Sequence, residues 1–239
     1  MAQSDTVERI LDAAEALFAE RGFAETSLRT ITSTAGVNLA AVNYHFGSKK
    51  ELIQAVFARF LSPFCRELDE SLNLLMRENE NPSTGLLLKA LFQTALLRGD
   101  EIAAGLDQNR DFGRPGAADS MPTGNSSEEK VQRFMRLLGL AYNQSQGHLR
   151  RFIVANYGDH YRRFTLLLKS SAPQLDPISF YWRLYFMLGA TVFTLSSFDS
   201  IASILKEDFS EETSLDAAAD LLVPALTGMF ENADEPQNP

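Results

Sequence analysis

The chain has 239 residues, of which 45% are apolar, so it has enough hydrophobic material for one large domain or two modest ones and is not a disordered polypeptide. Its net charge of −9, from 22 Lys and Arg against 31 Asp and Glu, excludes a uniformly basic surface for nucleic acid. The single cysteine, Cys65, favours a reducing cytoplasm, and the first residues are too polar for a signal peptide, so we expect a cytoplasmic protein.

Apolar residues recur at intervals of three and four along almost the whole chain, which predicts an all-α protein. The first expected helix follows the apolar stripe of residues 7–18. Asp5, with Glu8 three residues later, is its expected start, and Gly22 is its expected stop.

A long helix is expected after Ser48, which forms a capping-box pattern with Glu51. It should kink or end near Ser62, because Pro63 cannot donate a backbone hydrogen bond. Further helices are expected at residues 83–98, 128–144, 147–171, 178–206 and 213–230.

Two segments are too polar, or too rich in Gly and Pro, to add to a core. Residues 113–127 hold three Gly and two Pro and are expected to form a mobile loop, and residues 232–239 are expected to be a disordered tail. Residues 178–198 approach the composition of a membrane span, but Arg183 interrupts them. We therefore expect a helix of a soluble protein there and no membrane partner.

The charge changes sign within the first fifty residues. Residues 1–25 hold two Arg against six Asp and Glu, whereas residues 26–50 hold Arg29, Lys49 and Lys50 and no acid. This acid-free window is a local surface that a polyanion tolerates despite the acidic total.

The same window has the spacing of a helix–turn–helix. The apolar residues that mark the buried sides of its two short helices are Leu28, Ile31 and Ala35, then Leu39, Val42 and Phe46. Gly36 lies between them and is able to take the left-handed conformation that ends a helix. In such a motif the exposed side of the second helix enters the major groove of DNA. The alternative is that two amphipathic helices joined by a glycine simply pack together.

The exposed side of the second helix holds residue types that suit DNA. The small side chains of Ala40 and Ala41 allow close approach and contact thymine methyl groups, and Asn43 is able to pair with adenine. Tyr44, His45 and Lys49 are placed to reach phosphates. The complete predicted set of DNA-contacting residues is Thr26, Ser27, Arg29, Asn38, Ala40, Ala41, Asn43, Tyr44, His45 and Lys49.

Taken together, these residues resemble the TetR family of one-component bacterial transcription regulators. The resemblance spans about residues 4–60 and rests on Arg21-Gly22-Phe23, Thr26-Ser27, Gly36-Val37 and the run from Tyr44 to Leu52. It implies a three-helix DNA-binding domain at residues 1–47 and a larger helical ligand-binding and dimerisation domain at residues 48–231. Many family members carry an aromatic residue where this chain has Asn43, which leaves the operator sequence open.

A narrower resemblance points to the branch of this family that responds to fatty acids and represses β-oxidation genes in gammaproteobacteria. It rests on the start of the chain, on residues 134–141, on residues 144–150, and on Trp182-Arg183 with residues 186–190. This resemblance, and not composition, implies a long-chain fatty acid or acyl-CoA as effector.

Candidate effector-binding residues follow from the apolar helices and the few polar groups among them. The predicted set is Phe134, Arg136, Leu138, Gln146, His148, Trp182 and Phe186. Any single apolar residue of this set is more often a core residue than an effector contact. For Arg136 we favour an internal acid or a dimer contact as partner over a ligand carboxylate.

The sequence therefore predicts a homodimeric repressor that binds double-stranded operator DNA. No nucleophile elbow, P-loop or Gly-x-Gly-x-x-Gly motif is present and the three histidines are scattered, so we expect no enzyme activity, no cofactor and no metal site. Two alternatives remain: a regulator of efflux genes that responds to another hydrophobic ligand, and a helical lipid-binding protein or enzyme that does not bind DNA.

Overall fold

A computed structural model of the chain describes residues 2–96, 127–144 and 146–232, and within these ranges the protein is all-helical, as the sequence predicts. The helices are α1 (Ala2–Glu25), α2 (Leu28–Ala35), α3 (Leu39–Phe46), α4 (Lys49–Glu78), α5 (Thr84–Leu96), α7 (Ser127–Asn143), α8 (Gly147–Ser170), α9 (Pro177–Ser196), α10 (Phe198–Phe209) and α11 (Leu215–Glu231). The expected loop up to residue 126 and the expected tail from residue 233 lie outside the described residues.

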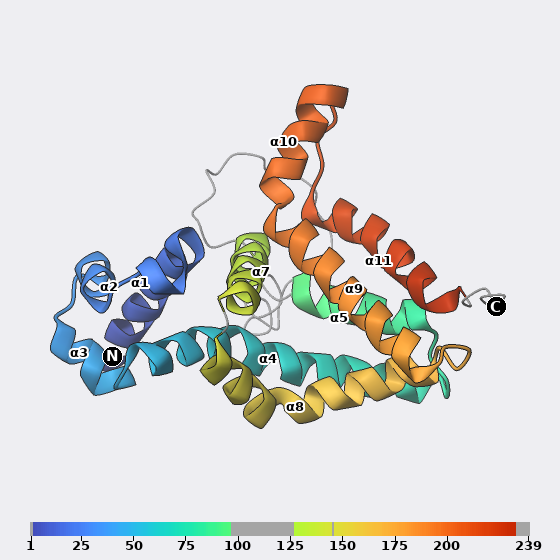
Figure 1. Cartoon of the computed structure of the whole chain (residues 1–239), viewed down its shortest axis with the longest axis horizontal. Coiled ribbons are helices and arrows are strands. Elements are labelled where there is room, and N and C mark those ends of the chain that lie inside the picture. Colours follow the sequence, from blue (N-terminus) through green and yellow to red (C-terminus); the bar gives the residue numbers. More distant parts are fainter. Residues whose placement is uncertain (1, 97–126, 145, 233–239) are drawn as a thin grey trace, which may run out of the picture.

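Helices α1, α2 and α3 form a group at one end of the long helix α4, and α8 runs along the other part of α4 (Figure 1). The expected start of α1 at Asp5 is wrong, because the helix already begins at Ala2. Gly22 does interrupt it, with φ 81° and ψ 169°, although helical turns continue to Glu25. Gly22 therefore bends the chain toward α2 instead of ending the helix outright.

Helix α4 runs through Pro63 to Glu78, so it does not end near Ser62, and a kink at Pro63, the other expected outcome, stays a prediction. A proline removes one backbone hydrogen bond, but packing on either side of it compensates. Cys65 is buried two residues later, and the hydroxyl groups of Ser62 and Tyr157 on α8 are hydrogen-bonded at 2.7 Å. Tertiary contacts thus hold a helix that local propensity alone would interrupt.

The single helix expected at residues 178–206 is two helices, because the backbone turns at Ser197. Ser197 has φ −106° and ψ 11°, and its N–H donates to the carbonyl of Phe193. Apolar spacing continues across the turn through Leu195 and Phe198, both buried, which is why sequence periodicity does not reveal the break.

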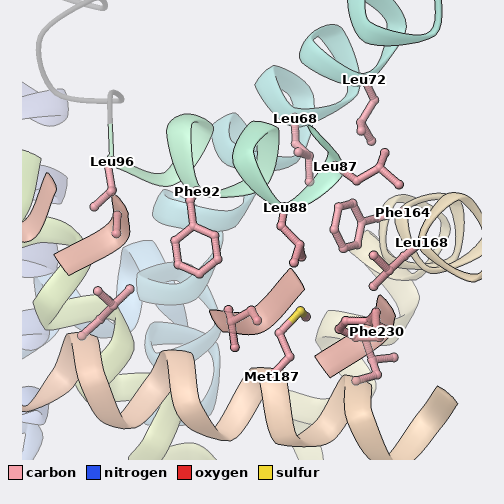
Figure 2. Close-up of a cluster of buried hydrophobic side chains, with 14 of the residues drawn as sticks. Leu68, Leu72, Leu87, Leu88, Phe92, Leu96, Phe164, Leu168, Met187 and Phe230 are labelled. Carbon is pink, nitrogen blue, oxygen red and sulfur yellow. The ribbon is translucent and has the colours of Figure 1, made fainter. Parts of the chain in front are cut away.

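Two clusters of buried side chains hold the helices together. The N-terminal cluster joins α1–α4 and also takes in Phe134 and Leu137 of α7 and Leu149 of α8. The C-terminal cluster lies between α4, α5, α8, α9 and α11, and Figure 2 shows its side chains pointing toward one another. Because α7 contributes to the N-terminal cluster, the DNA-binding core predicted for residues 1–47 is completed by later helices.

Helix α9 carries much of its apolar surface on the outside. It is long and apolar enough to cross a membrane, and 22% of its most apolar 18-residue window is buried. Its exposed side includes Trp182 and Phe186, whose rings stack at 5.8 Å, and Phe193. Length and composition alone are weak grounds for a membrane span, and a protein partner would cover such a face equally well.

Candidate nucleic-acid interface

Helices α2 and α3 are held against α1 by their buried sides. Ile31 and Val42 are fully buried in the N-terminal cluster, and Ala35 is nearly so. Between the two helices, Gly36 adopts φ 62° and ψ 38°, the left-handed conformation that the sequence predicts for it. The prediction that Leu39 lies on the inner side is wrong, because 40% of its surface is exposed.

The outer side of α3 presents the residues predicted to read DNA. Ala40 and Asn43 are exposed and Tyr44 keeps 76% of its surface accessible, while Ala41 and His45 are half-buried. The ring of Tyr44 meets that of His45 edge-on at 5.0 Å. This surface therefore carries a protruding phenol beside small side chains and one amide, with no acidic residue among them.

Helix caps fix the N-terminal ends of the three helices around this surface, α2, α3 and α4. The side chains of Ser27, Asn38 and Ser48 accept hydrogen bonds from the backbone N–H groups of Thr30, Ala41 and Glu51. The Ser48 half of the predicted capping box is thereby confirmed, whereas the N–H of Ser48 donates to the carbonyl of Phe46 and not to the side chain of Glu51. The caps orient the positive N-terminal ends of α2, α3 and α4.

Two further predicted contacts lie at helix starts. Arg29 is exposed on the first turn of α2, and Lys49 is the first residue of α4. The Nζ atom of Lys49 lies 3.5 Å from the carbonyl oxygen of Ala24, so its ammonium group stays near the α1–α2 turn.

Thr26 does not belong with the predicted DNA contacts. None of its surface is exposed, and its hydroxyl reaches the carbonyl oxygens of Leu17 at 3.1 Å and Gly22 at 2.8 Å. The hydroxyl instead satisfies carbonyls left open where Gly22 interrupts α1. The neighbouring Ser27 takes the exposed capping role.

Arg9 supports the helix–turn–helix in a way that sequence reasoning missed. Its Nη2 atom donates to the carbonyl oxygens of Ala35 at 2.5 Å and Gly36 at 3.0 Å. The guanidinium thus caps the negative end of α2 directly beneath the turn. No local spacing signals this contact, because the partners lie 26 and 27 residues apart in the chain.

The acidic residues of α1 are held away from the outer side of α3. Arg59 of α4 pairs with Asp12 at 2.6 Å, with Glu8 at 2.9 Å and with Glu15 at 3.5 Å. Arg133 of α7 also lies 3.5 Å from Glu15. Burial raises the pKa of Glu15, and the two guanidinium groups only partly offset that effect. These pairs neutralise three of the acids of α1, while α3 itself has no acidic residue.

The end of α7 is joined to the bend in α1. The side-chain oxygen of Gln144 accepts a hydrogen bond from the N–H of Phe23 at 3.2 Å. A Cβ atom on Gly22 would lie 2.7 Å from the amide nitrogen of Gln144, so the contact needs glycine there.

At the start of α8, the Nε2 atom of His148 lies 2.9 Å from the side-chain oxygen of Gln146. Burial lowers the pKa of His148, and Lys50 and Arg151 lower it further.

The predicted effector-binding residues do not form one group. Phe134 is buried in the N-terminal cluster, with its ring stacked on Phe60 at 3.8 Å, and Leu138 packs at the edge of that cluster. Gln146 and His148 lie at the start of α8, whereas Trp182 and Phe186 lie on the exposed side of α9. Any shared effector role for this set remains a prediction.

Arg136 has the internal acid that we favoured as its partner. Its guanidinium lies 2.9 Å from the carboxylate of Asp199 and donates to the carbonyl of Ser196 at 3.1 Å. The side chain is nearly half exposed, so it is not the buried cation that the apolar sequence around it indicates. It fixes α7 to the junction of α9 and α10.

Four exposed tyrosines from three helices, Tyr142, Tyr161, Tyr181 and Tyr185, lie close enough together to affect one another's pKa, which the sequence did not indicate. Burial raises the pKa of Tyr161 on α8, and the phenols of Tyr185, Tyr181 and Tyr142 raise it further. Burial likewise raises the pKa of Tyr142, at the end of α7, and Tyr185 adds to the effect. We call these residues the tyrosine group.

Within the described ranges, no set of three or more His, Cys, Asp and Glu side chains could hold a metal ion.

Known regulators match both ends of the chain. The family described as "Bacterial regulatory proteins, tetR family" matches residues 10–56, and "Tetracyclin repressor-like, C-terminal domain" matches residues 122–229. The regulator TtgR of Pseudomonas putida is 44% identical over 52 residues, which are 22% of this chain and 25% of TtgR. The uncharacterized regulator TtgW of the same species is 33% identical over 107 residues, 44% of this chain and 78% of TtgW. The match to TtgR thus spans only about a quarter of its length.

Solved structures share the fold over almost the whole chain. A mutant of HlyIIR superposes with a TM-score of 0.57 at 16% identity and covers 96% of this chain and 97% of its own. The regulator PfmR from Thermus thermophilus superposes with a TM-score of 0.53 at 17% identity and covers 95% of this chain and 100% of its own. At these identities the likeness concerns the fold alone.

Proposed function

Because this chain belongs to the TetR family of bacterial regulatory proteins, we propose that it is a repressor that binds palindromic operator DNA as a homodimer and leaves it when a hydrophobic effector binds. The observation that carries this proposal is the outer side of α3, where Ala40, Asn43 and Tyr44 are exposed on a surface without acids. In the proposed division, residues 1–47 form the DNA-binding domain and residues 48–231 bind the effector and the second subunit, while Lys49, at the start of α4, adds a DNA contact from the second domain.

We infer that α3 enters the major groove. A groove about 12 Å wide accepts one α-helix, and small side chains such as Ala40 let the backbone approach the base edges. Asn43 would read bases, while Tyr44 and Lys49 would contact phosphates. Ser27 and Arg29, at the start of α2, are exposed on the same module and would contact the flanking phosphates.

The proposed homodimer forms through α9 and α11, the described helices whose outer sides are mostly apolar or small. On α9 the outer side carries large side chains, including Trp182, Phe186 and Phe193. On α11 it carries Ala217, Leu221, Pro224 and Ala225. The large side chains of α9 and the side chains of α11, which are small except for Leu221, are complementary across a two-fold axis. The two copies of α3 would then lie one turn of DNA apart, about 34–36 Å, or a multiple of it.

The proposed effector is a long-chain fatty acid or its CoA thioester. The C-terminal cluster consists mainly of packed Leu, Phe and Met side chains, and we propose that they repack to admit an acyl chain, as such side chains do around irregular apolar shapes. The four tyrosines of the tyrosine group are exposed and lie outside this cluster, and we propose that their hydroxyl groups hold the polar end at the surface. Arg136 is already paired with Asp199, so we do not assign it to the effector. Binding releases DNA only if the effector prefers the state that does not fit the operator.

Selection of genomic fragments by the purified full chain tests the DNA step. We expect enrichment of a palindromic sequence and an affinity that falls steeply with salt, because several phosphates are neutralised. Tyr44→Ala should weaken binding to the selected duplex, whereas Tyr161→Phe, far from α3, should not. A chain that enriches no sequence is the helical lipid-binding protein of our alternative.

Titration of the preformed DNA complex tests the effector step. A long-chain fatty acid or its thioester should release DNA, while butyrate, which has the same head group and a short chain, should not. Tyr161→Phe should raise the concentration of acyl effector needed without changing operator affinity. Release by planar cationic drugs but not by any acyl chain would favour the efflux-type regulator instead.

A further inference from the structure

Helices α7, α8 and α9 are neighbours in space as well as in the chain. Where α7 turns into α8, the N–H of Gln146 donates to the carbonyl of Ala141 at 3.5 Å. A short turn at residues 171–176 joins α8 to α9, and these two helices diverge from it (Figure 1). Helix α7 also packs against α9. The tyrosine group has members on all three helices, so it lies on the surface between them.

Thr165 adds a buried hydroxyl without a partner on the same side of α8. Only 6% of Thr165 is exposed, yet its Oγ1 atom has no hydrogen-bond partner in the part of the chain that the structure describes. Thr165 follows Tyr161 by four residues, which places both on one side of the helix. The phenol of Tyr161 is near enough for an electrostatic effect but lies outside hydrogen-bond geometry. Because an unpaired buried hydroxyl weakens a fold, its presence here points to a ligand that pairs with it.

Arg150, in the first turn of α8, brings a positive charge to this surface. Its side chain is exposed and forms no ion pair or hydrogen bond with another residue of the described ranges. Burial raises the pKa of Tyr142, the phenol of Tyr185 raises it further, and the Arg150 guanidinium lowers it, which places Arg150 beside the tyrosine group. No acidic side chain is among the groups that shift the pKa of Tyr142 or Tyr161. A guanidinium and several hydroxyl groups without a competing acid suit an anion.

We propose that Arg150, with Thr165 and the tyrosine group, binds the ionised carboxylate of the acyl effector. The inference rests on the acyl effector of the proposed function and specifies the chemical form of its polar end. The guanidinium would pair with the carboxylate oxygens, and the hydroxyl groups would donate to them. An ester or thioester group is uncharged, so Arg150 would gain no ion pair from it. The site therefore selects the free acid.

The same stretch of α8 connects this site to the C-terminal cluster. Phe164 precedes Thr165 directly and Leu168 follows it by three residues, and Figure 2 shows both side chains pointing into the cluster. An acyl chain whose carboxylate lies at Thr165 would therefore enter the cluster beside α8. The proposed dimer leaves this route open, because the α9 tyrosines precede Trp182 and Phe186 by one residue each and are turned about 100° from them toward α8.

Release of the full-length chain from a selected operator by palmitate and by methyl palmitate, both delivered from cyclodextrin, tests the site. We expect the wild type to need at least about tenfold less palmitate than methyl ester, because the ion pair forms only with the acid. Arg150→Met should remove this preference by weakening the response to palmitate alone. Arg151→Met, which removes the adjacent exposed arginine, should keep both responses within about twofold of the wild type.

Thr165→Val gives a readout that a role in packing alone would not produce. The variant keeps the shape of the side chain and removes the unpaired hydroxyl, so the free chain should unfold at a urea concentration no lower than the wild type. It should nevertheless need more palmitate for release from DNA. A loss of stability would mean that the hydroxyl is paired within the protein, which overturns its part in the site.

Failure of the carboxylate site is distinguishable from failure of the acyl effector. An undiminished preference for palmitate in Arg150→Met overturns the site. A wild type that responds equally to palmitate and its methyl ester, or only to palmitoyl-CoA, also overturns it, while the acyl effector stands. A wild type that no acyl compound releases from DNA overturns the effector of the proposed function and the site with it.

Discussion

Replacing Gly22 by alanine tests how α7 is joined to the DNA-binding helices. Gly22 has φ 81° and ψ 169°, a region that only glycine occupies readily, so alanine should cost about 1–3 kcal/mol in backbone strain. The added Cβ would also displace the Gln144 amide, 2.7 Å away, and break its bond to Phe23. That loss adds about 0.5–1.5 kcal/mol. The expected total is about 1.5–4.5 kcal/mol of unfolding free energy, or roughly 3–18 °C in Tm.

Urea unfolding of Gly22→Ala, Gln144→Ala and the double variant separates the two contributions. In the Gln144→Ala background, alanine at position 22 should cost only the strain, because nothing is left to displace. The difference between the two backgrounds should match the Gln144 hydrogen bond. A cost below about 0.5 kcal/mol in both backgrounds would refute the conformation of Gly22. Purely additive effects would refute its contact with Gln144.

Three further changes test particular contacts. Arg9→Met should lower the free energy of unfolding by about 1–2 kcal/mol, because the carbonyls at the end of α2 lose their hydrogen-bond donor. Arg21→Met, on the exposed surface, should change that free energy little. Equal effects of the two variants would contradict the capping role of Arg9. Ile31→Ala, at a fully buried site, should cost about 2–5 kcal/mol by chemical denaturation, and a neutral result would contradict its burial. The pKa of His148 is lowered from 6.5, so just below that pH the unfolded chain binds more protons than the folded chain, and the free energy of unfolding should fall on acidification. His148→Gln should remove this dependence of the unfolding free energy on pH. An unchanged dependence in the variant would mean that other groups cause it.

Local signals in the sequence predict much of the fold. The cap at Ser48, the left-handed turn at Gly36 and the buried positions Ile31 and Val42 all depend on neighbours within one or two turns, and the structure has each of them. The prediction that Thr26 contacts DNA is wrong because its burial depends on contacts that the local sequence does not reveal. Thr and Ser are equally suited to a surface cap, and only the open carbonyls near Gly22, seen in three dimensions, decide that Thr26 is buried.

Contacts between distant helices account for what the sequence could not predict. Arg59 and Arg133 give no local sign that both would lie near Glu15, because helical spacing says nothing about which helices meet. The break at Ser197 is hidden because apolar spacing continues across it. The packing of α7 into the N-terminal cluster is likewise invisible in the sequence, although it makes the DNA-binding end depend on later helices.

Binding of a selected operator over a range of salt concentrations tests the central claim most directly. The account predicts that Lys49→Met reduces the slope of log affinity against log salt by about 0.9, because one phosphate contact is lost. It predicts that Asn43→Ala leaves the slope unchanged and relaxes discrimination at one base pair of each half-site, by about 1–3 kcal/mol. Wild-type slope, affinity and base discrimination in both variants would mean that α3 does not face the DNA.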